Sequence, residues 1–141
     1  MIVHGGLIAA RIGGAWRGAL IEGASGEGKS DLALRAIDAG FRLCADDRVE
    51  LWASGARLYG CAPPTLQGLI EARGLDVVRL AALTFCEVAL VVQFGTPERL
   101  PEPHWVEREG IQIPAFLLSP YEASAPLRLR LALAHAQALR P

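Results

Sequence analysis

The sequence predicts one α/β domain with a mixed, largely antiparallel sheet and a glycine-rich loop embedded between a strand and a helix. Three observations carry this prediction. The 141 residues, 52% of them hydrophobic, suffice for one ordinary core over residues 1–141, and we do not expect a second domain. Two hairpin patterns occur in the first 60 residues, and a glycine-rich stretch separates a short apolar run from a helical one. Hairpins exclude strict alternation of strand and helix, and therefore a purely parallel sheet.

Turn residues and apolar periodicity place the elements of the first half. A predicted hairpin comprises Leu7 to Arg11, Gly13-Gly14 and Gly18 to Glu22, and a predicted helix runs from Ser30 to Ala39 and stops at Gly40. Ala33, Ala36 and Ile37 share one face of that helix. The elements that follow are a short strand from Phe41 to Ala45, the pair Asp46-Asp47, and a second hairpin of Val49 to Ala53 and Ala56 to Tyr59 around Ser54-Gly55.

The second half is predicted to hold one central strand and a final helix. In chain order we expect a short helix from Leu66 to Ala72, a further helical segment from Val77 to Leu83, a central strand from Glu87 to Val92, a loop from Gly95 to His104, a last strand or strand pair from Ile111 to Leu118 broken at Pro114, and a helix from Pro126 to Arg140. Leu127, Leu131, Ala134 and Ala138 are expected to form the buried face of the final helix.

Charge and composition exclude several classes of partner. The net charge of −1, with histidine neutral, provides no electrostatic footprint for nucleic acid or an anionic membrane. No segment reaches the roughly 18 apolar residues of a membrane span, and the N-terminus lacks the pattern of a signal peptide. Cys44, Cys61 and Cys86 are odd in number and lack metal-ligand spacing, which indicates reduced thiols. We expect a soluble cytoplasmic protein with no nucleic-acid or membrane partner.

The glycine-rich stretch matches the P-loop pattern G-x-x-x-x-G-K-[ST] at every fixed position. It comprises Gly23, Ala24, Ser25, Gly26, Glu27, Gly28, Lys29 and Ser30. Glycines let backbone N–H groups close around phosphate oxygens, the lysine reaches the β- and γ-phosphates, and the hydroxyl ligates Mg²⁺. The predicted strand before the loop and the predicted helix after it supply the context that this motif requires. The stretch therefore predicts a site for a nucleotide and Mg²⁺.

Asp46 and Asp47 follow the first strand after the P-loop helix, so either carboxylate can lie beside the bound phosphates. Adjacent side chains on a strand point to opposite faces, so one can face the transferred phosphoryl group while the other serves structure or metal. A carboxylate in that place can accept a proton from an attacking hydroxyl or hold Mg²⁺. An Asp-Asp pair is otherwise a common capped turn.

Several segments together resemble the catalytic domain of bacterial HPr kinase/phosphorylase. They are His4-Gly5, the P-loop through Asp31, Phe41 to Asp47, and Leu69 to Leu75, which is similar to the family's E-x-R-G-hydrophobic signature. They span most of the first half of the chain in the family's order and approximate spacing. The resemblance implies a fold similar to the nucleotide-binding half of phosphoenolpyruvate carboxykinase, a mixed sheet with an embedded P-loop.

The resemblance also implies roles for individual residues. Lys29 and the loop amides would bind ATP, Ser30 and Glu71 would ligate Mg²⁺, and Asp47 would be the general base toward the serine hydroxyl of the phosphocarrier HPr. His4 resembles an active-site histidine of the family, with a flexible terminal histidine as the alternative. Arg99 resembles the family's catalytic arginine, with a solvated loop arginine as the alternative. The resemblance further implies a homo-oligomer, commonly a hexamer.

The chain also departs from the family pattern. It begins close to His4 and so resembles short forms consisting of the catalytic domain alone. Glu27 and Asp76 replace an apolar residue and a glycine, respectively. The family's basic Pro-x-Arg-Pro-Gly-Arg-Asn loop aligns with Ser119 to Pro126, which holds no basic residue. We therefore expect kinase activity with weak or absent reverse phosphorolysis, unless Arg128 or Arg130 supplies the missing charge.

Two other functions remain open from the sequence. One is a kinase or NTPase acting on a small molecule, which differs from the first hypothesis only in the acceptor. The other is a nucleotide-sensing partner protein that binds ATP and turns little over. Asp47 together with Glu71 argues against the second, because a protein that only binds nucleotide needs no base.

Overall fold

The protein is described from a computed structural model that covers residues 1–24 and 26–139. The strands are β1 (Ile2–Ile12), β2 (Ala15–Glu22), β3 (Arg42–Ala45), β4 (Arg48–Ser54), β5 (Arg57–Cys61), β6 (Leu69–Ala72), β7 (Asp76–Arg79), β8 (Cys86–Phe94), β9 (His104–Arg108) and β10 (Ile111–Leu118). The helices are α1 (Lys29–Asp38), α2 (Ala125–Ala138) and the short 3-10 helix η1 (Pro64–Leu66). None of the helices in this described part is long and apolar enough to cross a membrane.

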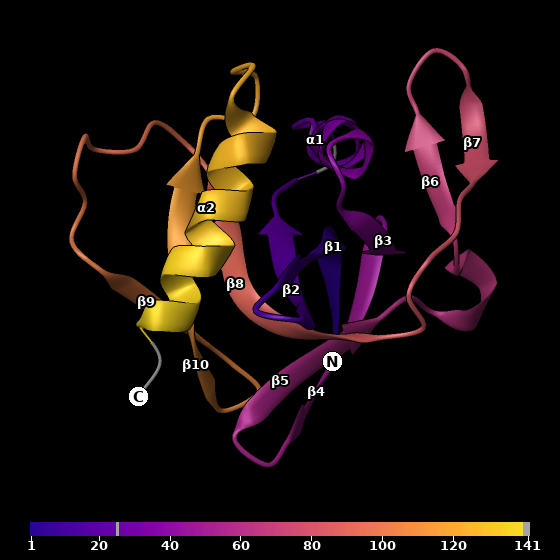
Figure 1. The fold of residues 1–141 in the computed structure, drawn as a ribbon. Helices are drawn as coiled ribbons and strands as arrows, with labels where there is room; N and C mark the ends of the chain where they lie inside the picture. Colours follow the sequence, from indigo (N-terminus) through magenta and orange to yellow (C-terminus); the bar gives the residue numbers. More distant parts are fainter. Residues whose placement is uncertain (25, 140–141) are drawn as a thin grey trace.

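The main sheet has eight strands, and most of its pairings are antiparallel (Figure 1). β1 pairs with β2 on one side and with β3 and β4 on the other. β4 pairs with β5, β5 pairs with β8, and β8 pairs with β2. The strands β1, β2, β8, β5 and β4 therefore form a closed ring of pairings. β8 is parallel to both β2 and β10. The predicted mixed, largely antiparallel sheet is confirmed, and the carboxyl ends of β2, β8 and β10 lie at one edge.

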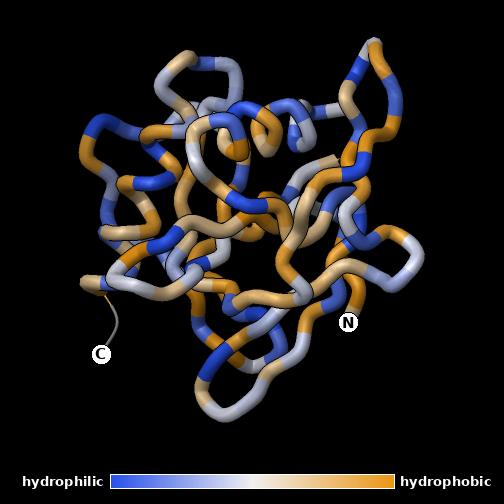
Figure 2. The backbone as a smooth tube through the Cα atoms, turned by 45° about the vertical axis from the view of Figure 1, so that its right-hand side comes forward, coloured by the Kyte–Doolittle hydropathy of each residue, from blue (hydrophilic) through white to orange (hydrophobic). Residues whose placement is uncertain are grey.

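Successive side chains along the strands point to opposite faces of the sheet and form one hydrophobic core on each face. Ile8 and Ile21 face the core that α1 and α2 cover, whereas their neighbours Leu7 and Leu20 face the core on the other side, and all four are fully buried. Figure 1 shows α2 crossing β8 and β10, with α1 above the ends of β1 to β3. In Figure 2 hydrophobic stretches run through the middle of the molecule, where these strands lie.

The predicted hairpins, the first helix and the central strand are confirmed. The segments predicted as helices from Leu66 to Ala72 and from Val77 to Leu83 are wrong, because this region forms η1 and the separate β6–β7 hairpin. Gly68 and Gly74 bracket β6 with φ angles of 77° and 84°, a left-handed conformation that interrupts a helix. A short apolar run between glycines fits a helix or a strand equally well by periodicity.

The C-terminal half holds two further differences. β10 runs unbroken through Pro114, which pairs with Trp105 of β9, a strand that the sequence patterns did not reveal. The buried face of α2 consists of Ala125, Leu129, Leu133 and Ala136. The predicted face of Leu127, Leu131, Ala134 and Ala138 is wrong, since all four are exposed. Leucines alternate along this helix, so two faces have helical spacing, and docking on the sheet selects one.

The observed buried face of α2 predicts that two leucine-to-alanine substitutions in this helix lower the free energy of unfolding by different amounts. Leu133→Ala should lower the free energy of unfolding by about 2–5 kcal/mol, because it leaves a cavity in the helix-covered core. Leu131→Ala removes the same atoms from a side chain that is 59% exposed and should cost less than about 0.5 kcal/mol. Chemical denaturation of both variants measures the difference. Equal losses would contradict the assigned face.

Candidate functional site

The predicted P-loop joins β2 to the N-terminus of α1. Gly26 and Gly28 adopt φ angles of 83° and 93°, which glycine reaches without steric cost. The first helical hydrogen bond runs from Leu32 N–H to Gly28 O at 3.0 Å, so three N–H groups precede it. No side chain of the described residues caps this end. A helix start with free N–H groups is suited to bind an anion.

Two side chains of the loop close it on itself. The Lys29 ammonium donates a hydrogen bond to Ala24 O at 2.7 Å, and the Glu27 carboxylate accepts one from the Ala24 N–H. A bound phosphate would compete with Glu27 for backbone donors and with Ala24 O for the ammonium. Ser25, also predicted to bind nucleotide, lies outside the described residues.

Asp46 joins three elements of the site through one carboxylate. It accepts hydrogen bonds from Ser30 Oγ at 2.9 and 3.0 Å and from the Glu71 N–H at 3.3 Å. It is the one buried charged side chain of the described residues, at 7% exposure, and burial raises the pKa of its carboxyl while the Ser30 hydrogen bond opposes the shift. Because Ser30 donates its only proton to Asp46, the lone pairs of its hydroxyl remain for a cation.

Asp46 and Asp47 interrupt the pairing of β3 and β4 with β1. The Gly5 N–H donates to Asp47 O at 3.1 Å, the Arg48 N–H donates to Asp46 O at 2.8 Å, and Asp47 has a φ angle of 69°. Both residues lie in the bend between β3 and β4 and not on a strand, so the strand alternation expected from the sequence does not apply to them, and both line one pocket. The Asp47 side chain is 63% exposed, in contrast to buried Asp46. Asp47 is therefore the carboxylate that an incoming substrate can reach.

A pocket of about 150 Å³ collects these groups. It is lined by Gly26, Gly28, Lys29, Ser30, Asp31, Asp46, Asp47, Glu71 and Arg73. Carboxylates outnumber cationic side chains in this lining by four to two, so a triphosphate would be repelled without a metal ion. No group of three or more His, Cys, Asp or Glu side chains in the described chain forms a complete metal cage. Oxygen donors without such a cage fit Mg²⁺, which binds through one or two carboxylates plus substrate phosphates.

Two predicted catalytic residues lie outside this pocket. His4 is exposed on β1 opposite Arg48, next to the strand position whose N–H binds Asp47 O. Arg99 is exposed in the loop between β8 and β9. Neither lines the pocket formed by the described residues. Their catalytic roles stay predictions, and the alternative of a solvated arginine fits the position of Arg99.

Glu22, the residue before the P-loop, forms an ion pair that sequence patterns did not suggest. Arg108 of β9 donates to both oxygens of Glu22, at 2.8 and 2.6 Å, and Gln93 of β8 donates to the same carboxylate at 3.5 Å. The Glu22 and Arg108 side chains are 18% and 22% exposed, and their proximity raises the pKa of Arg108. The partners are 86 residues apart, so no local pattern could join them.

The segment from Ser119 to Pro126, with which the resemblance aligns a basic loop, packs on α1. Arg35 of α1 donates to Pro120 O and to Glu122 O, the latter at 3.3 Å. Arg128 pairs with Glu122 at 3.5 Å, and Arg130 lies over the Phe41 ring at 5.2 Å. In the part of the chain that the structure describes, neither Arg128 nor Arg130 lines the pocket at the P-loop. The two arginines therefore add no positive charge to the lining of this pocket.

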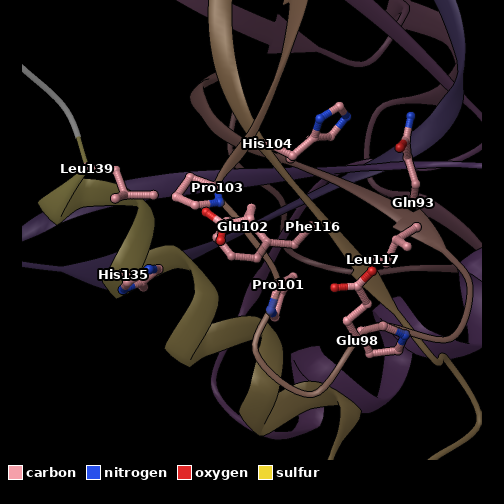
Figure 3. A pocket seen from close by; sticks show the side chains of 12 residues that line it. Gln93, Glu98, Pro101, Glu102, Pro103, His104, Phe116, Leu117, His135 and Leu139 are labelled. Carbon is pink, nitrogen blue, oxygen red and sulfur yellow. The ribbon is translucent and has the colours of Figure 1, made fainter.

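A second, larger and mostly apolar pocket lies between the loop after β8, β10 and α2. Its volume is about 330 Å³, and Figure 3 shows Pro101, Pro103 and Phe116 beside His135 of α2 and Leu139, which follows the helix. His104 and Gln93 lie on its other side. No P-loop residue in the described part of the chain lines it.

Comparison with known proteins gives a consistent result. Residues 1–91 match the model of the HPr Serine kinase C-terminal domain. The chain is 39% identical over 103 residues to HPr kinase/phosphorylase of Brevibacillus brevis, covering 67% of this chain and 32% of that protein. It is 39% identical over 100 residues to the enzyme of Stenotrophomonas maltophilia, covering 64% and 31%. The chain thus spans about a third of the length of these relatives.

A solved structure, that of the Hpr(Ser) kinase/phosphatase from Coxiella burnetii, has the same fold. The TM-score is 0.80 at 24% identity, and the match covers 98% of this chain and 97% of that chain.

The Glu22–Arg108 pair predicts a measurable effect on stability. Arg108→Met should lower the free energy of unfolding by about 1–3 kcal/mol, because it leaves a mostly buried carboxylate with only Gln93. Arg128→Met is the matched control, since its ion pair with Glu122 is about half exposed and should contribute less than about 1 kcal/mol. Chemical denaturation at low salt compares the two. Similar small losses would show that the pair does not anchor the loop.

Proposed function

Because the chain belongs to the HPr kinase/phosphorylase family, we propose that it is an ATP- and Mg²⁺-dependent kinase for a serine hydroxyl of HPr or a related phosphocarrier. The observation that carries the proposal is the hydrogen-bonded set of Ser30, Asp46 and Glu71 beside an uncapped P-loop helix, with Asp47 exposed at the same pocket. The names of the relatives support HPr as the acceptor. By the same resemblance we propose a cytoplasmic homo-oligomer, with a hexamer as the first candidate.

The residues at the pocket fit distinct parts of the reaction. The N–H groups at the start of α1 and the Lys29 ammonium bind and orient the phosphates. Ser30 and Glu71 would hold Mg²⁺, which neutralises phosphate charge when bound. Asp46 fixes both of these residues, through the Ser30 hydroxyl and the Glu71 N–H. Its role is therefore to position them.

Asp47 is the proposed general base. Its carboxylate takes the proton of the attacking serine hydroxyl as the serine oxygen bonds to the γ-phosphorus. The bond from that phosphorus to the bridging oxygen breaks, and ADP leaves with the electron pair. An exposed side chain at the rim of the pocket suits contact with a protein substrate, which buried Asp46 could not reach without rearrangement.

Transfer of labelled phosphate from ATP to HPr in the presence of Mg²⁺ tests this proposal. Lys29→Ala should abolish transfer and leave the unfolding midpoint unchanged, because the exposed ammonium supports no core. Asp47→Asn should bind ATP normally and lower transfer by about 10²- to 10⁴-fold. Full transfer by Lys29→Ala would overturn the assignment of the P-loop, and full transfer by Asp47→Asn would move the base to Asp46. Hydrolysis of ATP without labelling of HPr would indicate a different acceptor.

We also propose that the reverse reaction is weak. Phosphorolysis brings inorganic phosphate next to phosphoserine, so two anions need positive charge beyond Lys29 and Mg²⁺. Residues 119–126 offer only Glu122 as a charged side chain, and Arg128 is paired with it. Incubating serine-phosphorylated HPr with the protein, Mg²⁺ and phosphate should release little pyrophosphate. Release at a rate comparable with the forward reaction would show that the basic loop is dispensable.

A further inference from the structure

The pocket at the P-loop is too small for a whole nucleotide. Its volume of about 150 Å³ lies below the roughly 300–1,000 Å³ of ordinary ligand pockets. If ATP phosphates occupy it, as proposed above, the nucleoside half must lie in an adjoining space. The following inference therefore rests on the proposed function and concerns a part of the ligand that the phosphate groups do not explain.

An open pocket of about 310 Å³ meets the P-loop from its other side. It is lined by Glu27, Phe94, Gly95, Thr96, Ser119, Pro120 and Tyr121, and we call it the nucleoside pocket. Glu27 stands between Gly26 and Gly28, which line the phosphate pocket, so the two pockets share the P-loop as a wall. The lining residues lie at the end of β8 and in the loops after β2, β8 and β10, and the carboxyl ends of these three strands meet at one edge. Ligands of α/β sheets bind at such an edge.

Tyr121 presents an aromatic ring at this junction. Its hydroxyl donates to Glu27 O at 3.2 Å, and its ring lies against Gly28, where an added Cβ would be 3.3 Å from Cε1. The residue is nevertheless 75% exposed, so much of the ring remains open to a ligand. Aromatic side chains placed in this way stack on nucleobases.

The walls of the nucleoside pocket are held in place without a ligand. The Gly95 N–H donates to Leu118 O at 3.1 Å, which ties the loop after β8 to the end of β10. The guanidinium of Arg35 holds the carbonyls on both sides of Tyr121. Apart from Glu27, whose carboxylate is engaged by the Ala24 N–H, the lining is uncharged. Such a lining suits a neutral base and sugar, and Thr96 and Ser119 add hydroxyls for polar contacts.

We propose that the base and ribose of ATP bind in the nucleoside pocket, with the base stacked on the Tyr121 ring. The larger pocket of Figure 3 is the rival location, but no described P-loop residue lines it, whereas the nucleoside is covalently joined to the phosphates. A base held on Tyr121 makes this residue a determinant of nucleotide affinity. It has no part in the binding of phosphate alone.

The test compares binding of Mg²⁺-ATP with binding of Mg²⁺ and inorganic tripolyphosphate, which has no nucleoside. Tyr121→Ala should weaken ATP about 5- to 100-fold and leave tripolyphosphate unchanged. Tyr121→Phe keeps the ring, loses the hydrogen bond to Glu27 O, and should keep the wild-type ratio of the two affinities. His104→Ala alters the rival pocket of Figure 3 and should change neither. Calorimetry or competition with a fluorescent nucleotide measures all four proteins.

Each other outcome overturns the inference in a distinct way. Equal weakening of both ligands by Tyr121→Ala would show that the residue only supports the loop. Selective loss of ATP binding in His104→Ala would place the nucleoside in the pocket of Figure 3. Wild-type protein that binds tripolyphosphate as tightly as ATP would have no nucleoside site, although the phosphate site would stand. Wild-type protein that binds neither ligand would remove the proposed function as well.

Discussion

The hydrogen bonds to the Asp46 carboxylate are the contacts on which the candidate site depends. Through them the start of α1, the irregularity between β3 and β4, and the β6–β7 hairpin share one group, via Ser30 and the Glu71 N–H. A buried carboxylate is costly unless its partners are in place, so these three elements cannot move independently at low cost. The same burial leaves Asp47, its neighbour, as the accessible carboxylate, which we propose as the general base. The different positions of the two aspartates, one buried and one exposed, thus underlie the different roles that we propose for them.

A second constraint is the parallel trio of β2, β8 and β10 inside a mostly antiparallel sheet. Parallel pairing brings their carboxyl ends, and the loops that follow, to one edge. The P-loop therefore lies between the acidic pocket that would hold phosphates and the nucleoside pocket, whose lining is uncharged apart from Glu27. The Glu22–Arg108 pair fixes the strand end from which the P-loop departs. The edge at which these strands end is therefore where we propose that the nucleotide binds.

Local patterns predicted those elements whose signals lie within the element. The first two hairpins, α1 and β8 have their turn residues, stop residues and apolar runs in sequence, and all were found. The errors concern cases in which the sequence permits two solutions. The run of β6 fits helix or strand, and both faces of α2 have leucines at helical spacing. In these cases packing against distant segments determines the conformation or the buried face, and a local sequence pattern does not reveal that packing.

The sequence alone predicted the glycine-rich loop between a strand and a helix, the mixed sheet, and Asp46, Asp47 and Glu71 as candidate site residues, and the structure brings these three residues to one pocket. The loop and the sheet follow from the backbone requirements of glycine and from hairpin turns, whereas Glu71 was indicated by the resemblance to the family. Only the tertiary structure decided which aspartate is buried and which face of α2 is covered. It also decided that Arg108 binds Glu22, the residue before the P-loop, and that Tyr121 binds Glu27 within it, across separations of 86 and 94 residues. Burial and long-range contact depend on how the strands pair, and pairing across such separations leaves no periodic trace in the chain.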